Sequence, residues 1–210
     1  TWNAHSGEER RLKVRWLMNP GAEPMLGAEI IEQSGVIMDV RPLADWQADD
    51  VWPVLLTPPL INSHTHLEFS SLEQPLAPSE PFPEWIRSLM RWRREQPATA
   101  ESAIQLGILE SQCAGVAILG EITTGEIVSL ATSYSTSNGS PRIVSFRECI
   151  GLREGRIREQ LETAARHLEA AVGGPILRGL SPHAPYTVHP QLLAGLSALA
   201  AKNQVPVAMH

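Results

Sequence analysis

Two histidines separated by a single residue stand out in the stretch PPLINSHTHLEFS, residues 58–70. His64 and His66 follow a short apolar run, and Glu68 comes two residues later. Side chains at positions i and i+2 of a β-strand point to the same face. If the run is a strand, both imidazoles face the same way and can share one cation, for which zinc is the usual partner. In a loop the same spacing is an ordinary coincidence, so the motif alone leaves metal binding open.

A third histidine completes a plausible ligand set. Catalytic zinc sites usually take three protein ligands and leave one position for water. His210 ends the apolar segment VPVAMH, residues 205–210, and is the natural third ligand if that segment is another strand of the same layer. Taken alone, a histidine at that position has no assigned role. We therefore predict a metal site formed by His64, His66 and His210.

The histidines belong to a repeating pattern of apolar and amphipathic segments that begins after Pro59. Apolar runs bounded by turn residues predict strands, and apolar residues spaced three or four apart predict helices. Strands are predicted over residues 60–64, 115–122, 142–149, 176–183 and 205–210. Helices are predicted over residues 82–96, 100–113, 126–134, 157–172 and 189–204.

The first of these helices has a distinctive surface. Trp85, Leu89 and Trp92 fall on one face and are predicted to pack in the core. Its three arginines are predicted to lie on a solvated face: Arg91, Arg93 and Arg94. Residues 12–58 instead show short strands and turns, with a hairpin predicted around Ser34 and Gly35.

Strands alternating with helices predict a parallel sheet with right-handed crossovers, either an open doubly wound sheet or a (β/α)8 barrel. No glycine-rich phosphate-binding motif follows a strand. Polar side chains instead collect at the carboxyl ends of the strands, where a barrel keeps its active site. These residues are His64, His66, Glu121, Glu148, His183 and His210. Glu121 and Glu148 are predicted to be supporting or structural groups.

Composition narrows the class of protein. The chain has 210 residues, 43% of them hydrophobic, and a formal net charge of -6, so we expect a folded core and no nucleic-acid partner. No apolar run is long enough to span a bilayer and the N-terminal residues have no signal core, so no membrane partner and a cytoplasmic location are expected. Cys113 and Cys149 lie in apolar stretches and are predicted to be buried thiols.

Three segments resemble the amidohydrolase superfamily, in its cytosine deaminase and chlorohydrolase branch. LLTPPLINSHTHLEFS is similar to the first barrel strand of that superfamily, GLSPHAPYTVHPQLL to its fourth-strand segment, and VPVAMH to its fifth strand, whose terminal histidine is a ligand. The resemblance implies an α/β fold: the N-terminal part of a (β/α)8 TIM barrel of the metal-dependent hydrolase type, preceded by a small β-sandwich subdomain. Residues 1–58 would form the subdomain, and residues 59–210 the first five strands of the incomplete barrel.

Further details narrow the branch. Binuclear relatives bridge their metals with a lysine from the fourth strand, whereas this chain has only Lys13 and Lys202, so the resemblance implies one divalent metal ion, zinc first and iron as the alternative. HTHLEFS followed by FPEWIRSLMRWR, and FRECIGL later, resemble the aminodeoxyfutalosine deaminase group. The implied reaction is hydrolytic deamination of a small-molecule substrate, an aminated purine nucleoside.

The resemblance also implies two substrate-binding residues, His183 and Glu68. Each has a structural alternative: His183 can be held within its proline-rich loop, and Glu68 can cap the segment that follows it. No catalytic residue is assigned within the chain, because the proton-shuttling glutamate, the sixth-strand histidine and the eighth-strand aspartate of the superfamily would lie beyond His210.

The length supports a partial barrel. After residue 58 too few residues remain for a complete one, which takes about 250 residues and at least about 200. We therefore expect the N-terminal part of a longer enzyme, inactive by itself. Two alternatives stay open: a hydrolase acting on another C–N or C–halogen bond, and a non-catalytic half-barrel that serves as an interaction protein. Formation of a homo-oligomer is also left open.

Overall fold

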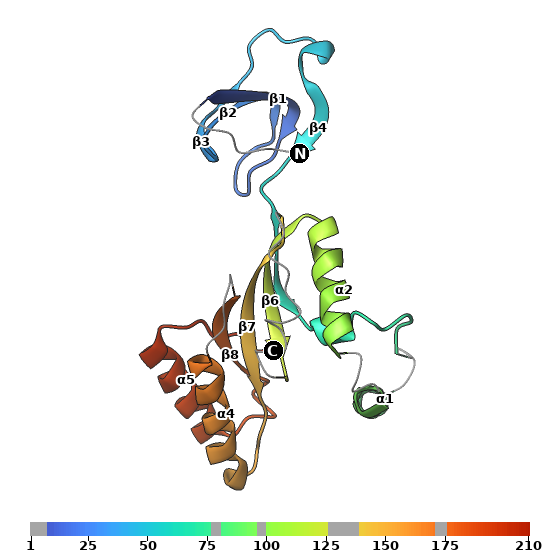
Figure 1. Cartoon of the computed structure of the whole chain (residues 1–210), viewed down its shortest axis with the longest axis vertical. Helices are drawn as coiled ribbons and strands as arrows, with labels where there is room; N and C mark the ends of the chain where they lie inside the picture. The colour runs from blue at the N-terminus through green and yellow to red at the C-terminus, as the bar shows by residue number, and fades with distance from the viewer. Residues whose placement is uncertain (1–7, 77–80, 96–99, 126–138, 171–175) are drawn as a thin grey trace. The chain divides into compact units, whose positions relative to one another are not determined.

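The computed structural model describes residues 8–76, 81–95, 100–125, 139–170 and 176–210. The chain divides into two compact units, Thr1–Pro59 and Leu60–His210, and each contains one four-stranded sheet (Figure 1). Within the described ranges, no helix combines the length and the apolar character that crossing a bilayer requires. The predicted helix over residues 126–134 lies outside the described residues.

The N-terminal unit is a mixed β-sheet with the strand order β3-β2-β1-β4. Its elements are β1 (Glu9–Leu17), β2 (Met25–Gln33), β3 (Val36–Pro42), the 3-10 turn η1 (Ala48–Asp50) and β4 (Trp52–Leu56). The β2–β3 hairpin turns at Ser34 and Gly35, which both have positive φ, 54° and 83°. Two-residue hairpin turns of this kind require positive φ at both positions, so the predicted hairpin is confirmed.

A β-sandwich consists of two packed sheets, whereas the described residues of this unit form one. All four strands pair edge to edge, so none remains to build the second layer. Val14, Leu17, Ala28 and Ile30 form a small buried cluster. The prediction of a β-sheet subdomain is correct, and its sandwich form is not seen in this part of the chain.

The C-terminal unit has a wholly parallel sheet with the order β5-β6-β7-β8. Its strands are β5 (Leu60–Thr65), β6 (Val116–Thr123), β7 (Arg142–Cys149) and β8 (Ile176–Pro182). Its helices are α1 (Phe82–Glu95), α2 (Ala100–Cys113), α4 (Ile157–Glu169) and α5 (Pro190–Asn203), with 3-10 turns η2 (Leu67–Phe69) and η3 (Glu154–Arg156). The parallel pairing of β5 with β6 confirms the predicted α/β architecture.

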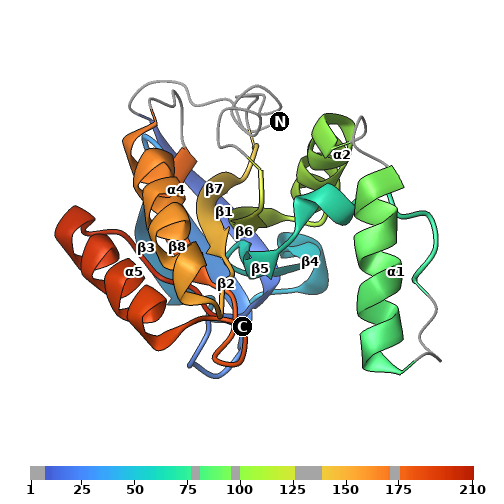
Figure 2. The same ribbon diagram turned by 90° about the horizontal axis from the view of Figure 1, so that it is seen from below.

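Helices pack on this sheet in two groups (Figure 2). Helices α4 and α5 contact each other and β8, while α2 contacts β6 and η2. Each group covers a separate apolar cluster, one centred on Leu119 and Ile143 and the other on Leu180 and Leu192. Cys149 belongs to the second cluster and is buried as predicted.

The other cysteine departs from the prediction. Cys113 is exposed. It occupies the last position of α2, where the helix ends and the chain turns into β6. The Cys113 thiol is therefore exposed even though the residues around it in the sequence are largely apolar.

The predicted fifth strand, residues 205–210, is only partly formed. Its backbone runs parallel to β8 through a single bridge, with Leu180 N–H donating to the Pro206 carbonyl at 3.1 Å and Ala208 N–H donating to the Leu180 carbonyl at 3.0 Å. Pro206 has no N–H to donate, and no described strand lies on the other side of this segment. The segment nevertheless follows the path predicted for it and carries His210 to the carboxyl end of the sheet.

Close contact between β5 and β6 predicts an effect of one small substitution. A Cβ at Gly120 would lie 2.2 Å from the Ser63 carbonyl oxygen, next to His64. Because that atom is backbone, the strands must separate, and we expect Gly120→Ala to lower the free energy of unfolding by about 1–3 kcal/mol. Gly155→Ala is the matched control, since nothing lies within 4 Å of its added Cβ. Urea denaturation measures both, and equal stabilities would contradict the packing argument.

Candidate metal centre and substrate cavity

Three histidines from distant parts of the chain converge at the carboxyl end of the parallel sheet. His64 lies in β5, His66 directly follows it, and His210 follows the segment beside β8. One ring nitrogen from each lies within 4.8 Å of the others. The ring centroids of His64 and His210 are 4.5 Å apart. The structure thus brings together the three residues predicted as metal ligands.

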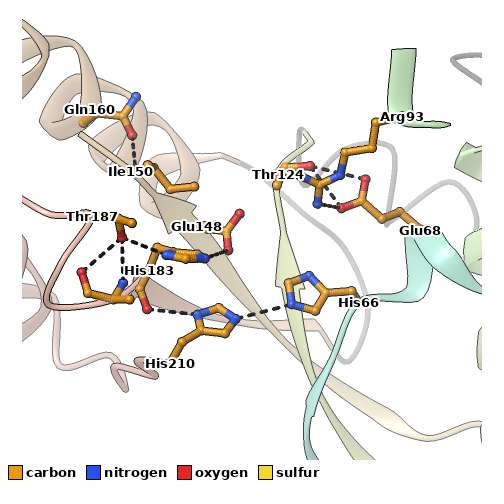
Figure 3. Close-up of polar contacts among 11 residues, drawn as sticks. His66, Glu68, Arg93, Thr124, Glu148, Ile150, Gln160, His183, Thr187 and His210 are labelled. Atoms are coloured by element: carbon orange, nitrogen blue, oxygen red, sulfur yellow. Dashed lines mark hydrogen bonds and ion pairs between the residues drawn. The ribbon is translucent and has the colours of Figure 1, made fainter. Parts of the chain in front are cut away.

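Hydrogen bonding fixes which nitrogen of His210 is available. Its Nδ1 lies 2.9 Å from the main-chain oxygen of His183, and a carbonyl only accepts, so Nδ1 carries the hydrogen. In the neutral ring the lone pair is then on Nε2. That atom lies 3.4 Å from Nε2 of His66 (Figure 3). Orientation of a ligating imidazole through its other nitrogen is a regular feature of metal sites.

The protonation of the cluster also suits a cation. Burial, followed by the charges of the neighbouring histidines, lowers the pKa of His66 to about 4. The pKa of His64 is lowered too, first by burial and then by His210. Metals bind the neutral form of imidazole, so rings that stay neutral at pH 7 are ready to ligate. Donor type, spacing and protonation all fit one divalent metal ion.

His183 lies beside this cluster and is held by its own loop. Its Nδ1 is 2.7 Å from Oγ1 of Thr187. The Thr187 hydroxyl also contacts the carbonyl and the N–H of Ala184, each at 3.1 Å. All three contacts are satisfied together when the hydroxyl donates to the Ala184 carbonyl and accepts from Ala184 N–H and from His183 Nδ1–H. This arrangement leaves Nε2 of neutral His183 with a free lone pair.

A cavity of about 580 Å³ opens next to the histidines. Its polar lining comes from the strand ends and the loop after β8: His66, Glu148, His183, Thr187 and His210. Its apolar lining comes largely from α1: Phe82, Trp85, Ile86, Leu89 and Met90. A cavity that combines apolar walls with a few convergent polar groups is the usual form of a small-molecule site.

The placement of α1 corrects the prediction of a core stripe. Trp85 and Leu89 line the cavity, and Trp92 contacts the ring of Phe69 with centroids 5.5 Å apart. No residue of α1 is fully buried. The apolar face of this helix therefore forms a wall of the cavity, because it does not pack on the sheet as α2, α4 and α5 do.

Arg93 was predicted to be solvated, and it too belongs to this region. It forms an ion pair with Glu68, and its guanidinium carbon lies 4.9 Å from the ring centroid of Phe69. Thr124 Oγ1 is 3.4 Å from the Glu68 carboxylate. Arg93 lines the cavity and Glu68 does not. A contact between Glu68 and the substrate stays a prediction, with its carboxylate already engaged.

The spacing of Arg93 in the sequence already indicated that it does not lie on a solvated helix face. Arg93 follows Trp85 and Leu89 at successive intervals of four residues, which places all three on one helix face. That face was predicted to be core, where an unpaired arginine is costly, so the arginine itself indicated a face that is not core.

Glu121 supports the backbone next to His66. Its Oε2 accepts the main-chain N–H of Leu67 at 2.9 Å. Burial raises the pKa of Glu121 to about 8, although the Leu67 N–H acts in the opposite direction. This carboxyl is therefore protonated in the folded chain at pH 7, whereas an exposed carboxyl is ionised.

The raised pKa of Glu121 makes stability depend on pH. Between 4.5 and about 8, folding keeps the proton that the unfolded chain releases, so stability falls as pH rises, by at most about 1.4 kcal/mol per unit. Glu121→Gln has no proton to lose, so its free energy of unfolding should rise relative to wild type between pH 5.5 and 7.5. Urea denaturation of metal-free protein at both pH values measures this. Glu110→Gln, on the exposed surface of α2, is the control, and an unchanged difference for Glu121→Gln would contradict the argument.

Comparison with known proteins agrees with the fold and identifies the family. Residues 55–210 match the sequence model of the amidohydrolase family, and the chain belongs to this family. It is 28% identical over 197 residues to the aminodeoxyfutalosine deaminase of Deinococcus radiodurans, covering 91% of this chain and 44% of that protein. It is also 28% identical to the 5-methylthioadenosine/S-adenosylhomocysteine deaminase of Pyrococcus furiosus, covering 87% and 45%. The chain thus spans less than half the length of these relatives.

Solved structures show the same fold. A crystal structure of Helicobacter pylori aminofutalosine deaminase with methylthio-coformycin superposes with a TM-score of 0.69 at 20% identity, covering 95% of this chain and 50% of that one. Atrazine chlorohydrolase from Arthrobacter aurescens TC1, crystallised with zinc, gives a TM-score of 0.70 at 16% identity, covering 95% and 52%. At these identities the similarity concerns the fold alone.

Proposed function

We propose that this chain supplies the first half of a metal-dependent hydrolase that removes an amino group from a purine nucleoside. The observation that carries the proposal is the convergence of His64, His66 and His210 beside a cavity with one largely apolar wall. The names of the two curated relatives support the substrate class, since both are deaminases of adenine-containing compounds.

The three histidines would hold one divalent metal ion. Zinc is the first candidate, because three imidazoles are a typical zinc set and a structural neighbour was crystallised with zinc; iron is the alternative. When bound, such an ion lowers the pKa of a coordinated water toward 7 and so provides a nucleophile near neutral pH.

The remaining residues bind and orient the substrate. His183 presents Nε2 while Thr187 holds its Nδ1, so the imidazole is oriented to contact a ring nitrogen or the departing amino group. Burial, followed by His210 and Arg93, lowers the pKa of His183 and favours its neutral form. The aromatic wall of α1 covers the face of a flat heterocycle and limits the access of water.

The 210 residues are proposed to be inactive by themselves. Positioned acid–base groups typically contribute about 100- to 10,000-fold to a rate, and the resemblance places the proton-shuttling glutamate beyond His210. The greater length of the relatives supports this view.

Ammonia release tests the proposal. The longest product of the reading frame and the 210-residue chain are each incubated with aminodeoxyfutalosine, adenosine and S-adenosylhomocysteine after loading with zinc or iron. We expect ammonia from the longer product with at least one substrate and none from the 210 residues. Chloride release from atrazine, with all three nucleosides inert, would favour the chlorohydrolase alternative and remove the nucleoside assignment.

A further inference from the structure

One buried carboxyl in the cavity has no hydrogen-bond donor among the described residues. Glu148 is the last residue but one of β7, its side chain is only 5% exposed, and it lines the cavity. Its Oε1 lies 4.0 Å from Nε2 of His183, which exceeds hydrogen-bonding distance (Figure 3). Buried carboxyls are nearly always hydrogen-bonded, so this group is suited to a donor supplied by a ligand.

Glu148 is also close to the metal centre. One of its carboxylate oxygens lies within 4.8 Å of ring nitrogens of both His183 and His210. A substrate whose reacting carbon sits at the three-histidine cluster would therefore extend other groups within reach of Glu148.

The chemistry of the substrate identifies the donor. Under the proposed function, on which this inference rests, an aminated purine nucleoside has hydrogen-bond donors only in its amino group and its sugar hydroxyls. The amino group must face His64, His66 and His210. In 5-methylthioadenosine, named for one of the relatives, a methylthio group replaces the 5′ hydroxyl. The donors common to these substrates are then the 2′ and 3′ hydroxyls.

The other carboxylate of this region is already occupied. Glu68 forms its ion pair with Arg93, accepts from Thr124 and does not line the cavity. We propose that Glu148 is the substrate-binding carboxylate of this site, and that it accepts a hydrogen bond from a ribose hydroxyl of the nucleoside. Glu68 then acts through Arg93, as a positioning residue for the cavity wall.

A substrate-by-variant cycle tests the assignment. The longest product of the reading frame is assayed with adenosine, 2′-deoxyadenosine and 3′-deoxyadenosine, as wild type and as Glu148→Ala and Glu148→Gln. Loss of a hydrogen bond to a charged group lowers kcat/KM by about 10- to 100-fold, so wild type should lose that much with one deoxy substrate. In Glu148→Ala, kcat/KM for adenosine should fall by a similar factor. This variant should then have equal kcat/KM values for adenosine and for the deoxy substrate that wild type disfavours. Glu110→Ala, on the exposed surface of α2, should match wild type.

Binding gives a second readout that does not need the reaction. Purine riboside has no amino group to lose, so its binding to metal-free protein can be measured by calorimetry. Wild type should bind one deoxy form of purine riboside more weakly than purine riboside itself, and Glu148→Ala should bind the two equally. If Glu148→Ala fails to fold, as judged by circular dichroism, Glu148→Gln carries the test, because it keeps the shape and loses the charge.

The outcomes separate the inference from the function on which it rests. A wild-type protein that deaminates adenosine, paired with a Glu148→Ala variant that still discriminates between hydroxylated and deoxy substrates as wild type does, would overturn the inference alone. A wild type that neither deaminates nor binds any nucleoside would remove both. Loss of discrimination in Glu148→Ala, with metal content unchanged, would establish it.

Discussion

Alanine in place of His64, His66 or His210 should lower the affinity for zinc by about 100-fold or more in each case. Loss of a group that only orients a metal ligand already costs about 10- to 100-fold, and loss of a ligand should cost at least as much. The three ring nitrogens lie within 4.8 Å of one another, so we expect each to contribute to the same ion. The wild-type chain should hold one metal ion.

Metal content after dialysis, by mass spectrometry, and competition with a chromogenic chelator measure this loss. His189→Asn is the matched control, because the His189 ring accepts the Gln191 N–H at the start of α5 and asparagine can also cap a helix. Full metal occupancy in the double variant His64→Ala/His66→Ala would rule out these residues as ligands.

Local periodicity explains why the convergence of the three histidines could be predicted. The two-residue period of a strand placed His64 and His66 on one face, and the parallel order of the strands brought their carboxyl ends to one edge. His210 could be added because an apolar run preceded it in the order expected for the next strand.

The cavity wall could not be predicted in the same way. Amphipathic spacing shows that α1 has an apolar face, but it does not show whether that face meets the sheet or a cavity. Glu68 and Arg93 are 25 residues apart, and their pairing depends on where α1 docks. An arginine on an apolar helix face indicates that it has an acidic partner, but the sequence does not show which residue that partner is.

The incomplete fifth strand has a similar cause. Apolar pattern predicts where a strand runs, while the number of its hydrogen bonds depends on its neighbours. Residues 205–210 have β8 on one side and no described strand on the other, and Pro206 cannot donate. The position of His210 was therefore predicted correctly, although residues 205–210 form fewer strand hydrogen bonds than predicted.

His183→Ala should lower kcat/KM for deamination by about 100- to 1,000-fold in the longest product of the reading frame. Removal of one hydrogen-bonding group that acts in the transition state typically has this effect. Thr187→Val should cause a smaller loss of about 2- to 10-fold, because it keeps the His183 ring and removes the hydroxyl that orients it, together with the contacts of that hydroxyl to Ala184. Ammonia release with the best nucleoside substrate measures both.

Metal content distinguishes a substrate-binding histidine from a ligand. His183 holds His210 through its main-chain oxygen, which alanine keeps, so metal should remain bound in His183→Ala. Thr163→Val is the control for Thr187→Val, since the Thr163 hydroxyl contacts Arg166 on the exposed side of α4. Glu148, His183 and His210 also lie close enough to hold an ion. Loss of metal together with activity in His183→Ala would therefore assign His183 to the metal centre, and full activity would remove it from the site.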